Sequence, residues 1–135
     1  MALFDWKDIY SVNVGEIDKQ HRILIDTLNE LYEAMLARKS DEILSETIKT
    51  LVNYTDFHFS FEENYMRTYN YADYPEHKKA HDNFVARVKD FQHQLKEGKL
   101  MLSMEIMNFL KDWLKNHIMV TDKKYSSFFN EKGIK

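Results

Sequence analysis

Apolar side chains recur every three or four positions along most of this 135-residue chain. This spacing places them on one face of an α-helix and differs from the strict alternation expected of a half-buried strand. Four such stretches predict helices over about residues 18–37, 41–67, 75–97 and 103–129. Strong helix breakers are scarce, since the chain holds three glycines and one proline. We therefore expect an all-α fold.

Local signals mark the ends of these helices. Ser40 is a suitable N-cap for the second helix, Pro75 stands in the first turn of the third, and Gly98 follows the last turn of the third. Because the connectors are short, consecutive helices should pack as antiparallel neighbours. The sequence therefore predicts an up-down-up-down four-helix bundle.

The first 17 residues precede the helical pattern but are not uniformly polar. They include Phe4, Trp6, Ile9 and Tyr10, which predicts an irregular N-terminal arm lying against the bundle. With 44% hydrophobic residues, a chain of this length can bury one core of ordinary size. We expect residues 1–135 to form a single domain and the protein to be a monomer.

Charge and composition exclude several classes of function. The 22 acidic and 19 basic residues are interspersed and give a formal net charge of -3, without the basic block that nucleic acid would require. The lack of cysteine excludes disulfides, thiolate metal sites and iron–sulfur clusters. No apolar run approaches a membrane span, so no membrane partner is expected. The N-terminal segment lacks the pattern of a secretory signal, so we expect a cytoplasmic protein.

Five of the six histidines fall on, or extend, the apolar faces of the predicted helices: His21, His58, His77, His81 and His117. A single histidine in such a place is usually a hydrogen-bonded core residue, but five without partners would be costly to bury. Glu62 follows His58 by four residues, and His81 follows His77 by four, so each pair projects from one helix face. All four helices thus contribute inward ligands, as metal sites in bundle cores do.

Asp122 does not follow from regular helical spacing. It lies five residues after His117, which rotates it by about 140° on an ideal helix. Asp122 could therefore be a solvated residue beside Lys123 and Lys124. However, Tyr125 follows three residues later, so the inward stripe resumes one position late. A local π-type bulge would produce this shift and turn Asp122 inward.

Five histidines and two carboxylates suggest two metal ions. Imidazole nitrogens suit iron, copper, nickel or zinc, while carboxylates can bridge two ions. A single tetrahedral zinc would leave three ligands unused, and the H-E-x-x-H segment of zinc proteases is absent. The Glu-x-x-His pairs of ferritin-like di-iron proteins are absent as well. The spacing alone leaves the identity of the metal open.

Four segments resemble the hemerythrin family, specifically its single-domain bacterial members. They are V-G-E-I-D-K-Q-H ending at His21, H-F-S-F-E-E from His58, H-K-K-A-H from His77, and W-L-K-N-H-I-M-V-T-D-K-K-Y from Trp113. The resemblance implies that His77, His81 and His117 hold one iron and that His21 and His58 hold the second. It also implies that Glu62, Asp122 and an oxo or hydroxo group bridge the two irons, and that oxygen binds at the second iron and takes up two electrons.

The resemblance also implies an apolar oxygen pocket lined by Phe59, Trp113, Leu114, Ile118 and Tyr125. Each of these residues has ordinary core packing as its alternative explanation. A pocket of this kind would keep water away from bound oxygen. Outer-shell hydrogen bonds should fix the histidine tautomers, and Gln20 and Glu63 are the candidates for them.

The expected function is reversible oxygen binding for storage, transport or delivery, without enzymatic activity. Three alternatives stay open: an oxygen, redox or nitric-oxide sensor; a di-iron oxidase, peroxidase or nitric-oxide reductase; and metal storage. Steady turnover with a reductant would reveal an enzyme, and loading beyond two ions per chain would reveal storage. Molecular oxygen is the expected ligand, and an oxygen-consuming enzyme or a reductase is the class of protein partner that an oxygen carrier would serve.

Overall fold

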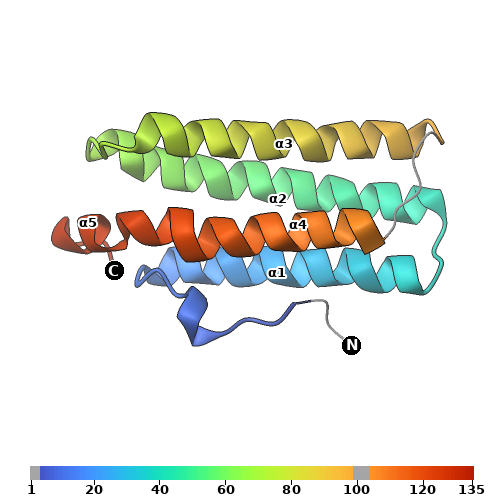
Figure 1. The fold of residues 1–135 in the computed structure, drawn as a ribbon, viewed down its shortest axis with the longest axis horizontal. Helices are drawn as coiled ribbons and strands as arrows, with labels where there is room; N and C mark the ends of the chain where they lie inside the picture. The colour runs from blue at the N-terminus through green and yellow to red at the C-terminus, as the bar shows by residue number, and fades with distance from the viewer. Residues whose placement is uncertain (1–3, 99–103) are drawn as a thin grey trace.

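A computed structural model describes residues 4–98 and 104–135 of the chain. Every regular element among these residues is helical, which confirms the predicted all-α fold (Figure 1). The α-helices are α1 (Gly15–Leu36), α2 (Asp41–Thr68), α3 (Tyr74–Lys96), α4 (Met104–Asn116) and a short α5 (Ser126–Glu131). α1 to α4 lie side by side with alternating direction, as the short connectors predict (Figure 1).

The observed helix ends follow from local hydrogen bonds. The Ser40 hydroxyl accepts from the backbone N–H of Ile43 at 3.3 Å and caps α2. Gly98 adopts a φ of +71° just after α3, a conformation that glycine tolerates best. α1 begins at Gly15, three residues before the predicted start. The Asp18 carboxylate accepts from the backbone N–H of Val12 at 2.8 Å, which fixes the chain entering the helix.

The fourth predicted helix, over residues 103–129, is interrupted. Residue 103 lies outside the described part of the chain. α4 ends at Asn116, and a π-helical turn (His117–Thr121, η2) and a 3-10 turn (Asp122–Tyr125, η3) lead into α5. The chain therefore stays helical through this region but changes its winding at His117.

The N-terminal arm packs against the bundle, as expected from its aromatic residues. Phe4 and Tyr10 are buried, and the arm contains a short 3-10 helix (Asp8–Tyr10, η1). The Asn29 side chain of α1 exchanges two hydrogen bonds with the Phe4 backbone, at 3.1 and 2.8 Å. Ile9 departs from the prediction because its side chain is 55% exposed. The single turn of η1 buries Tyr10 and points its neighbour outward.

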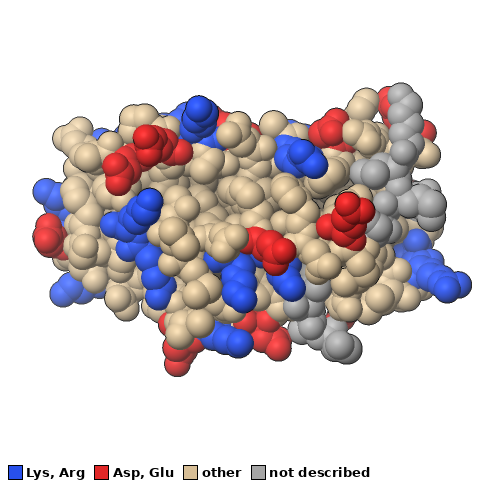
Figure 2. Space-filling model, viewed as in Figure 1, with Lys and Arg blue, Asp and Glu red and all other residues tan. Residues whose placement is uncertain are grey.

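Lysine and arginine side chains alternate with aspartate and glutamate over the face drawn in Figure 2. No extended patch of one sign dominates this face. Among the described residues, no helix is both long enough and apolar enough to cross a membrane. The interspersed acidic and basic residues of the sequence are thus also interspersed on this face of the molecule.

Candidate metal centre

The seven predicted ligands meet at one end of the bundle. His21 lies in the second turn of α1, His58 and Glu62 lie toward the end of α2, and His77 and His81 lie in the first turns of α3. The π-helical turn and the residue after it supply His117 and Asp122. All seven side chains are buried, none more than 4% exposed. The antiparallel arrangement brings these distant segments together.

The π-helical turn explains the position of Asp122. A regular α-helix would separate residues five apart by about 140°, but the wider turn lets His117 and Asp122 face the same interior. The Nε2 of His117 and the Oδ1 of Asp122 are 3.0 Å apart. The predicted π-type bulge is therefore confirmed, and the solvated alternative for Asp122 is excluded by its full burial.

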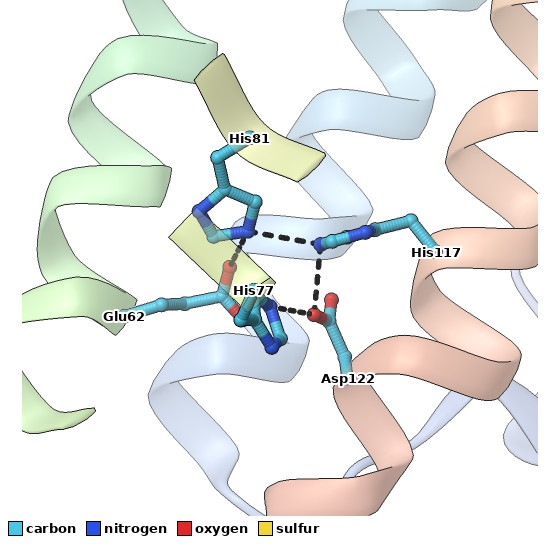
Figure 3. A group of neighbouring side chains, drawn as sticks. All are labelled: Glu62, His77, His81, His117 and Asp122. Atoms are coloured by element: carbon cyan, nitrogen blue, oxygen red, sulfur yellow. Dashed lines mark hydrogen bonds and ion pairs between the residues drawn. The ribbon is translucent and has the colours of Figure 1, made fainter. Parts of the chain in front are cut away.

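Asp122 contacts histidines from three different elements, and Figure 3 draws two of them, His77 and His117. Its Oδ1 lies 2.9 Å from the Nε2 of His77 and 3.0 Å from that of His117. Its Oδ2 lies 3.0 Å from the Nε2 of His21. Glu62 is placed similarly, because its Oε1 lies 3.0 Å from the Nε2 of His58 and 3.5 Å from the Nε2 of His81. Each carboxylate thus lies between histidines of α3 or the π-helical turn and a histidine of α1 or α2.

The ligand atoms form two overlapping groups. The first consists of Glu62, His77, His81, His117 and Asp122, and the second of His21, His58, Glu62 and Asp122. Within each group, the ligand atoms all lie within 4.8 Å of one another. The two groups share both carboxylates and no histidine. Donors arranged in this way suit two neighbouring cations bridged by carboxylates.

Two outer hydrogen bonds fix which histidine nitrogen faces the centre. The Nδ1 of His58 donates to the Oε1 of Gln20 at 2.7 Å, and the Nδ1 of His81 donates to the Oε2 of Glu63 at 2.9 Å. The predicted outer-shell contacts of Gln20 and Glu63 are therefore confirmed. With the proton on Nδ1, the neutral ring presents a bare Nε2 lone pair to the interior. This is the tautomer that a metal ligand requires.

Six of the inward atoms lack hydrogen-bond partners, whereas the Nε2 atoms of His81 and His117 lie 2.9 Å from each other. The six buried atoms are the Nε2 of His21, His58 and His77, the Oε1 of Glu62 and both carboxylate oxygens of Asp122. A bare Nε2 facing a carboxylate oxygen at 3.0 Å is repulsive, since both atoms carry lone pairs. A cation between them converts the repulsion into two coordinate bonds. The donor set therefore fits metal ions better than it fits a hydrogen-bond network.

Electrostatics keep both central carboxylates ionised. Burial and Asp122 raise the pKa of Glu62, but the nearby histidines outweigh them and lower it to about 2. Burial also raises the pKa of Asp122, yet His117, His21 and His77 hold it well below its ordinary value. Burial lowers the pKa of His81, which favours its neutral form. Burial also lowers the pKa of His77, but its contact with Asp122 outweighs burial and raises it. In the metal-free protein a proton on His77 thus balances part of the carboxylate charge, and a bound cation would replace that proton.

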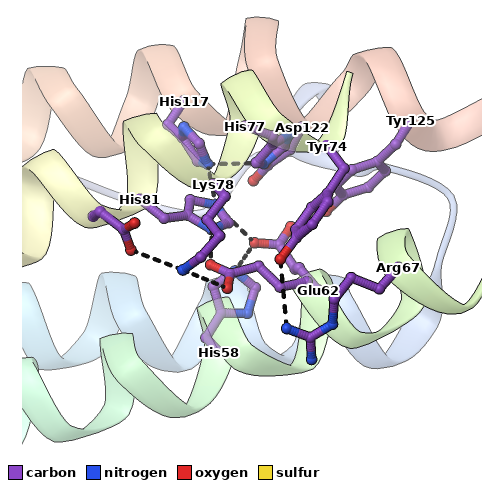
Figure 4. Close-up of polar contacts among 12 residues, drawn as sticks. His58, Glu62, Arg67, Tyr74, His77, Lys78, His81, His117, Asp122 and Tyr125 are labelled. Carbon is purple, nitrogen blue, oxygen red and sulfur yellow. Dashed lines mark hydrogen bonds and ion pairs between the residues drawn. The ribbon is translucent and has the colours of Figure 1, made fainter. Parts of the chain in front are cut away.

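Tyr125 has a role in the centre that the sequence did not reveal. Its hydroxyl donates a short hydrogen bond to the Oε2 of Glu62, and its ring stacks on His77 at 5.6 Å (Figure 4). Burial and the charges of Asp122 and Glu62 raise the pKa of Tyr125 well above 10, so the group stays a donor. Its spacing of three residues from Asp122 was the available signal. Tyr125 thus fixes the orientation of the Glu62 carboxylate.

The predicted pocket residues divide between two places. Phe59 and Leu114 line a small apolar cavity of about 10 Å³. The other lining residues are Leu24, Leu28, Leu51, Thr55, Phe84 and Leu110. Ile118 is fully buried, while Trp113 stacks on His117 at 4.5 Å. Trp113 and Tyr125 thus contact histidine rings, Ile118 belongs to the main core, and none of the three lines this cavity.

Lys78 extends the outer contacts to the surface. Its Nζ donates to the Oε1 of Glu63 at 3.4 Å and to the Oδ1 of Asp82 at 3.2 Å. Lys78 is partly exposed, so this contact links the buried His81–Glu63 pair to solvent. The four-residue spacing of Lys78 and Asp82 was the sequence signal for their ion pair.

Comparison with known proteins agrees with this geometry. Residues 12–128 match the family model described as Hemerythrin HHE cation binding domain. A bacteriohemerythrin of Methylococcus capsulatus is 34% identical over 93% of this chain and 95% of its own. A myohemerythrin of Theromyzon tessulatum is 32% identical over 90% of each chain. A crystal structure of wild-type hemerythrin superposes with a TM-score of 0.88 at 32% identity, covering 93% of this chain and 97% of that chain. The chain therefore belongs to the hemerythrin family.

Proposed function

We propose that the protein holds two iron ions in this centre and uses them to bind molecular oxygen reversibly. The observation that carries the proposal is the shared position of the carboxylates. Glu62 lies between His58 and His81, and Asp122 lies between His21 and the pair formed by His77 and His117. Carboxylates placed in this way can bridge two ions, with an oxo or hydroxo group completing the bridge.

The two donor groups are unequal, and this inequality supports a ligand-binding role. Three histidines belong to the first group and two to the second, while both carboxylates are shared. The second ion would therefore have one fewer protein ligand than the first. A bound ferrous pair supplies an open coordination position there, together with the two electrons on which oxygen binding draws.

The protein residues around the centre favour a small apolar ligand. Phe59 stacks on His81 at 3.6 Å and separates this ring from the apolar cavity. At about 10 Å³, the cavity is near the lower limit for one water-sized molecule and is too small for an organic substrate. Apolar walls keep water from the centre, and the Tyr125 hydroxyl holds the Glu62 carboxylate in place. We propose on this basis that the protein is an oxygen carrier and not an enzyme.

The test begins with metal-free protein loaded anaerobically with ferrous iron. Metal analysis should give two irons per chain. The visible spectrum is then followed while the sample is cycled between oxygen and vacuum. We expect a charge-transfer band that appears with oxygen, disappears under vacuum and returns on the next cycle.

Zinc-loaded protein is the matched control, because zinc fills the ligands without redox chemistry and should give no band. Immediate irreversible oxidation without a coloured species would contradict oxygen carriage. Sustained oxygen consumption in the presence of a reductant would show that the protein is an enzyme. Uptake of many irons per chain would favour metal storage.

A further inference from the structure

Tyrosines gather at the end of the bundle that holds the metal centre. Five of the eight tyrosines in the chain belong to this region: Tyr65, Tyr69, Tyr71, Tyr74 and Tyr125. Four of them pack with Phe128 and Phe129 in a second apolar cluster, separate from the main core, and the Tyr69 ring stacks on Tyr65. Packing alone would be served by phenylalanine, as these two neighbours show. The hydroxyl groups of these tyrosines therefore need an explanation other than packing.

Two of these tyrosines connect the centre with the surface. Tyr125 is fully buried and stacks on His77 with 5.6 Å between ring centroids and 19° between planes. Tyr71 lies 6.4 Å from Tyr125, and its side chain is 9% exposed. Tyr71 also lines a surface hollow of about 200 Å³, together with Asp73, Lys124 and the ligand His77. The Tyr125 ring thus contacts both His77 and the buried Tyr71, which borders this hollow.

Phenols are the side chains suited to pass single electrons over such distances. A tyrosine ring is oxidised far more easily than a phenylalanine ring, and electrons tunnel readily between aromatic rings in contact. Tyr125 also has a proton acceptor, because its hydroxyl donates to Glu62. The proton can shift along this hydrogen bond while the ring is oxidised and return when the ring is reduced.

We propose that Tyr125 and Tyr71 form an exit path that carries oxidising equivalents from the metal centre to the surface hollow when hydrogen peroxide reaches the metal ions. The proposal rests on a redox-active metal pair in the centre, as in the proposed function, but does not require reversible oxygen carriage. Its benefit is protective, since oxidation ends at Tyr71, which borders a hollow that solvent reductants can enter, and the ligands are spared.

The chemistry of the path balances. Each passage takes one electron from the Tyr71 phenol through Tyr125, and the Tyr71 proton leaves to water in the hollow. Two such passages supply the two electrons and two protons that convert one hydrogen peroxide into two water molecules. Each resulting Tyr71 phenoxyl radical is reduced by a soluble one-electron reductant, which returns one electron while water returns one proton.

A second aromatic contact offers a competing route. Trp113 stacks on His117 with 4.5 Å between centroids and 11° between planes, and its side chain is partly exposed. Oxidation leaving through Trp113 would bypass both tyrosines. The site of oxidation therefore distinguishes the two routes.

The experiment uses iron-loaded protein whose metal content and visible spectrum are recorded first. Hydrogen peroxide is added together with a nitroso spin trap, and adducts are located by peptide mass spectrometry, with freeze-quench electron paramagnetic resonance reporting the radical type. We expect a tyrosyl signal and an adduct at Tyr71. Tyr71→Phe should lose most of the adduct at this position while keeping its iron. Tyr125→Phe, compared at equal iron content, should also lose the Tyr71 adduct, although Tyr71 itself is intact.

Tyr32→Phe is the matched control, because Tyr32 is also 9% exposed but belongs to the main core on α1. This variant should behave like the unaltered protein. Three results would overturn the proposal: adducts at Trp113, an unchanged Tyr71 adduct in Tyr125→Phe, or the same adducts in metal-free protein. Protein that takes up no redox-active metal would overturn both this proposal and the proposed function. Loss of reversible oxygen binding alone would overturn only the latter.

Discussion

Gln20 and Glu63 act on the metal centre without facing it. Each accepts a hydrogen bond from the Nδ1 of one inward histidine and so directs the Nε2 lone pair of that ring inward. The two acceptors differ in charge. Glu63 is a carboxylate whose other oxygen accepts from Lys78, whereas Gln20 is a neutral amide. The Glu63 hydrogen bond therefore opposes the effect of burial, which lowers the pKa of His81.

Replacement of Glu63 tests this outer contact. Glu63→Ala should weaken metal binding by about 10- to 100-fold, because the His81 ring loses the partner that fixes its tautomer. Glu63→Gln keeps an acceptor for Nδ1 and should recover much of the loss. Competition with a metal chelator measures both affinities. Equal affinities for Glu63→Ala and the unaltered protein would show that the hydrogen bond does not support the ligand.

Leu114 is expected to control access of water to the centre. Leu114→Ala enlarges the apolar cavity next to Phe59 and should speed oxidation of the oxygen complex to the inert diferric form. The substitution should cost about 2 to 5 kcal/mol of stability while the fold survives. Leu31→Ala is the control, since Leu31 is fully buried but does not line the cavity. Equal oxidation rates in both variants would show that Leu114 contributes only to core packing and does not limit access of water.

The ionised carboxylates predict how pH affects the metal-free protein. The pKa of Glu62 is lowered to about 2 in the folded state, and that of Asp122 is lowered as well. Both are about 4 when the chain is unfolded. The stability they contribute is therefore complete above about pH 4 and is lost as the pH falls toward about 2. Urea unfolding between pH 5 and 2 should show this decline, and Glu62→Gln should flatten it.

At the scale of elements, the π-helical turn is the feature on which the ligand set depends. It absorbs one residue between His117 and Asp122, so these ligands meet although they are five apart. The other pairs, such as His58 and Glu62, are four apart in regular helix and reach the same 3.0 Å separation. The π turn thus brings two ligands that are five residues apart as close together as ligands four residues apart in a regular helix.

This interpretation predicts that shortening and lengthening the segment between His117 and Asp122 affect metal binding differently. Deleting Val120, which is 57% exposed, leaves four residues of spacing and a regular helix, so two metals should still bind. Inserting one alanine after Val120 creates a spacing of six, which should turn Asp122 away and reduce metal content below two per chain. Metal analysis of both proteins decides between the outcomes. Equal losses would mean that the π turn itself is required.

At the scale of the whole molecule, the metal centre and the main core occupy different parts of the bundle. The main core runs along α1 to α4, while the second apolar cluster lies around Tyr125 and joins the loop before α1 to the C-terminal segment. The Ser126 hydroxyl donates to the carbonyl of Val12 at 2.5 Å, and the Asn130 amide donates to that of Asn13 at 2.9 Å. The segment before α1 and the C-terminal segment are therefore hydrogen-bonded to each other next to the second apolar cluster.

Because folding brings the unpaired ligands together, metal binding should stabilise the folded state. At a free metal concentration 100 times the dissociation constant, the gain is about 2.7 kcal/mol, or roughly 10 °C in melting temperature. Calorimetry of metal-free and zinc-loaded protein at pH 7 measures this shift. Coincident melting of the two samples, with zinc still bound to the folded protein, would show that metal binding and folding are not linked.

The sequence determined the helices, the bundle and most of the ligands. Helical periodicity, Ser40, Pro75 and Gly98 set the elements, because these signals act within a few residues. The pairs His58 with Glu62 and His77 with His81 were visible because a spacing of four places side chains on one helix face. The family resemblance then assigned these residues to two irons, a role that spacing alone left open.

Only the tertiary structure decided the contacts between elements. Gln20 meets His58 from another helix, Tyr125 reaches Glu62 across 63 positions of sequence, and the cavity draws its walls from all four helices. Periodicity says which face a residue occupies but not which residue lies opposite, because that depends on how the helices are offset and rotated in the bundle. For the same reason, the sequence could not predict that Trp113 stacks on His117.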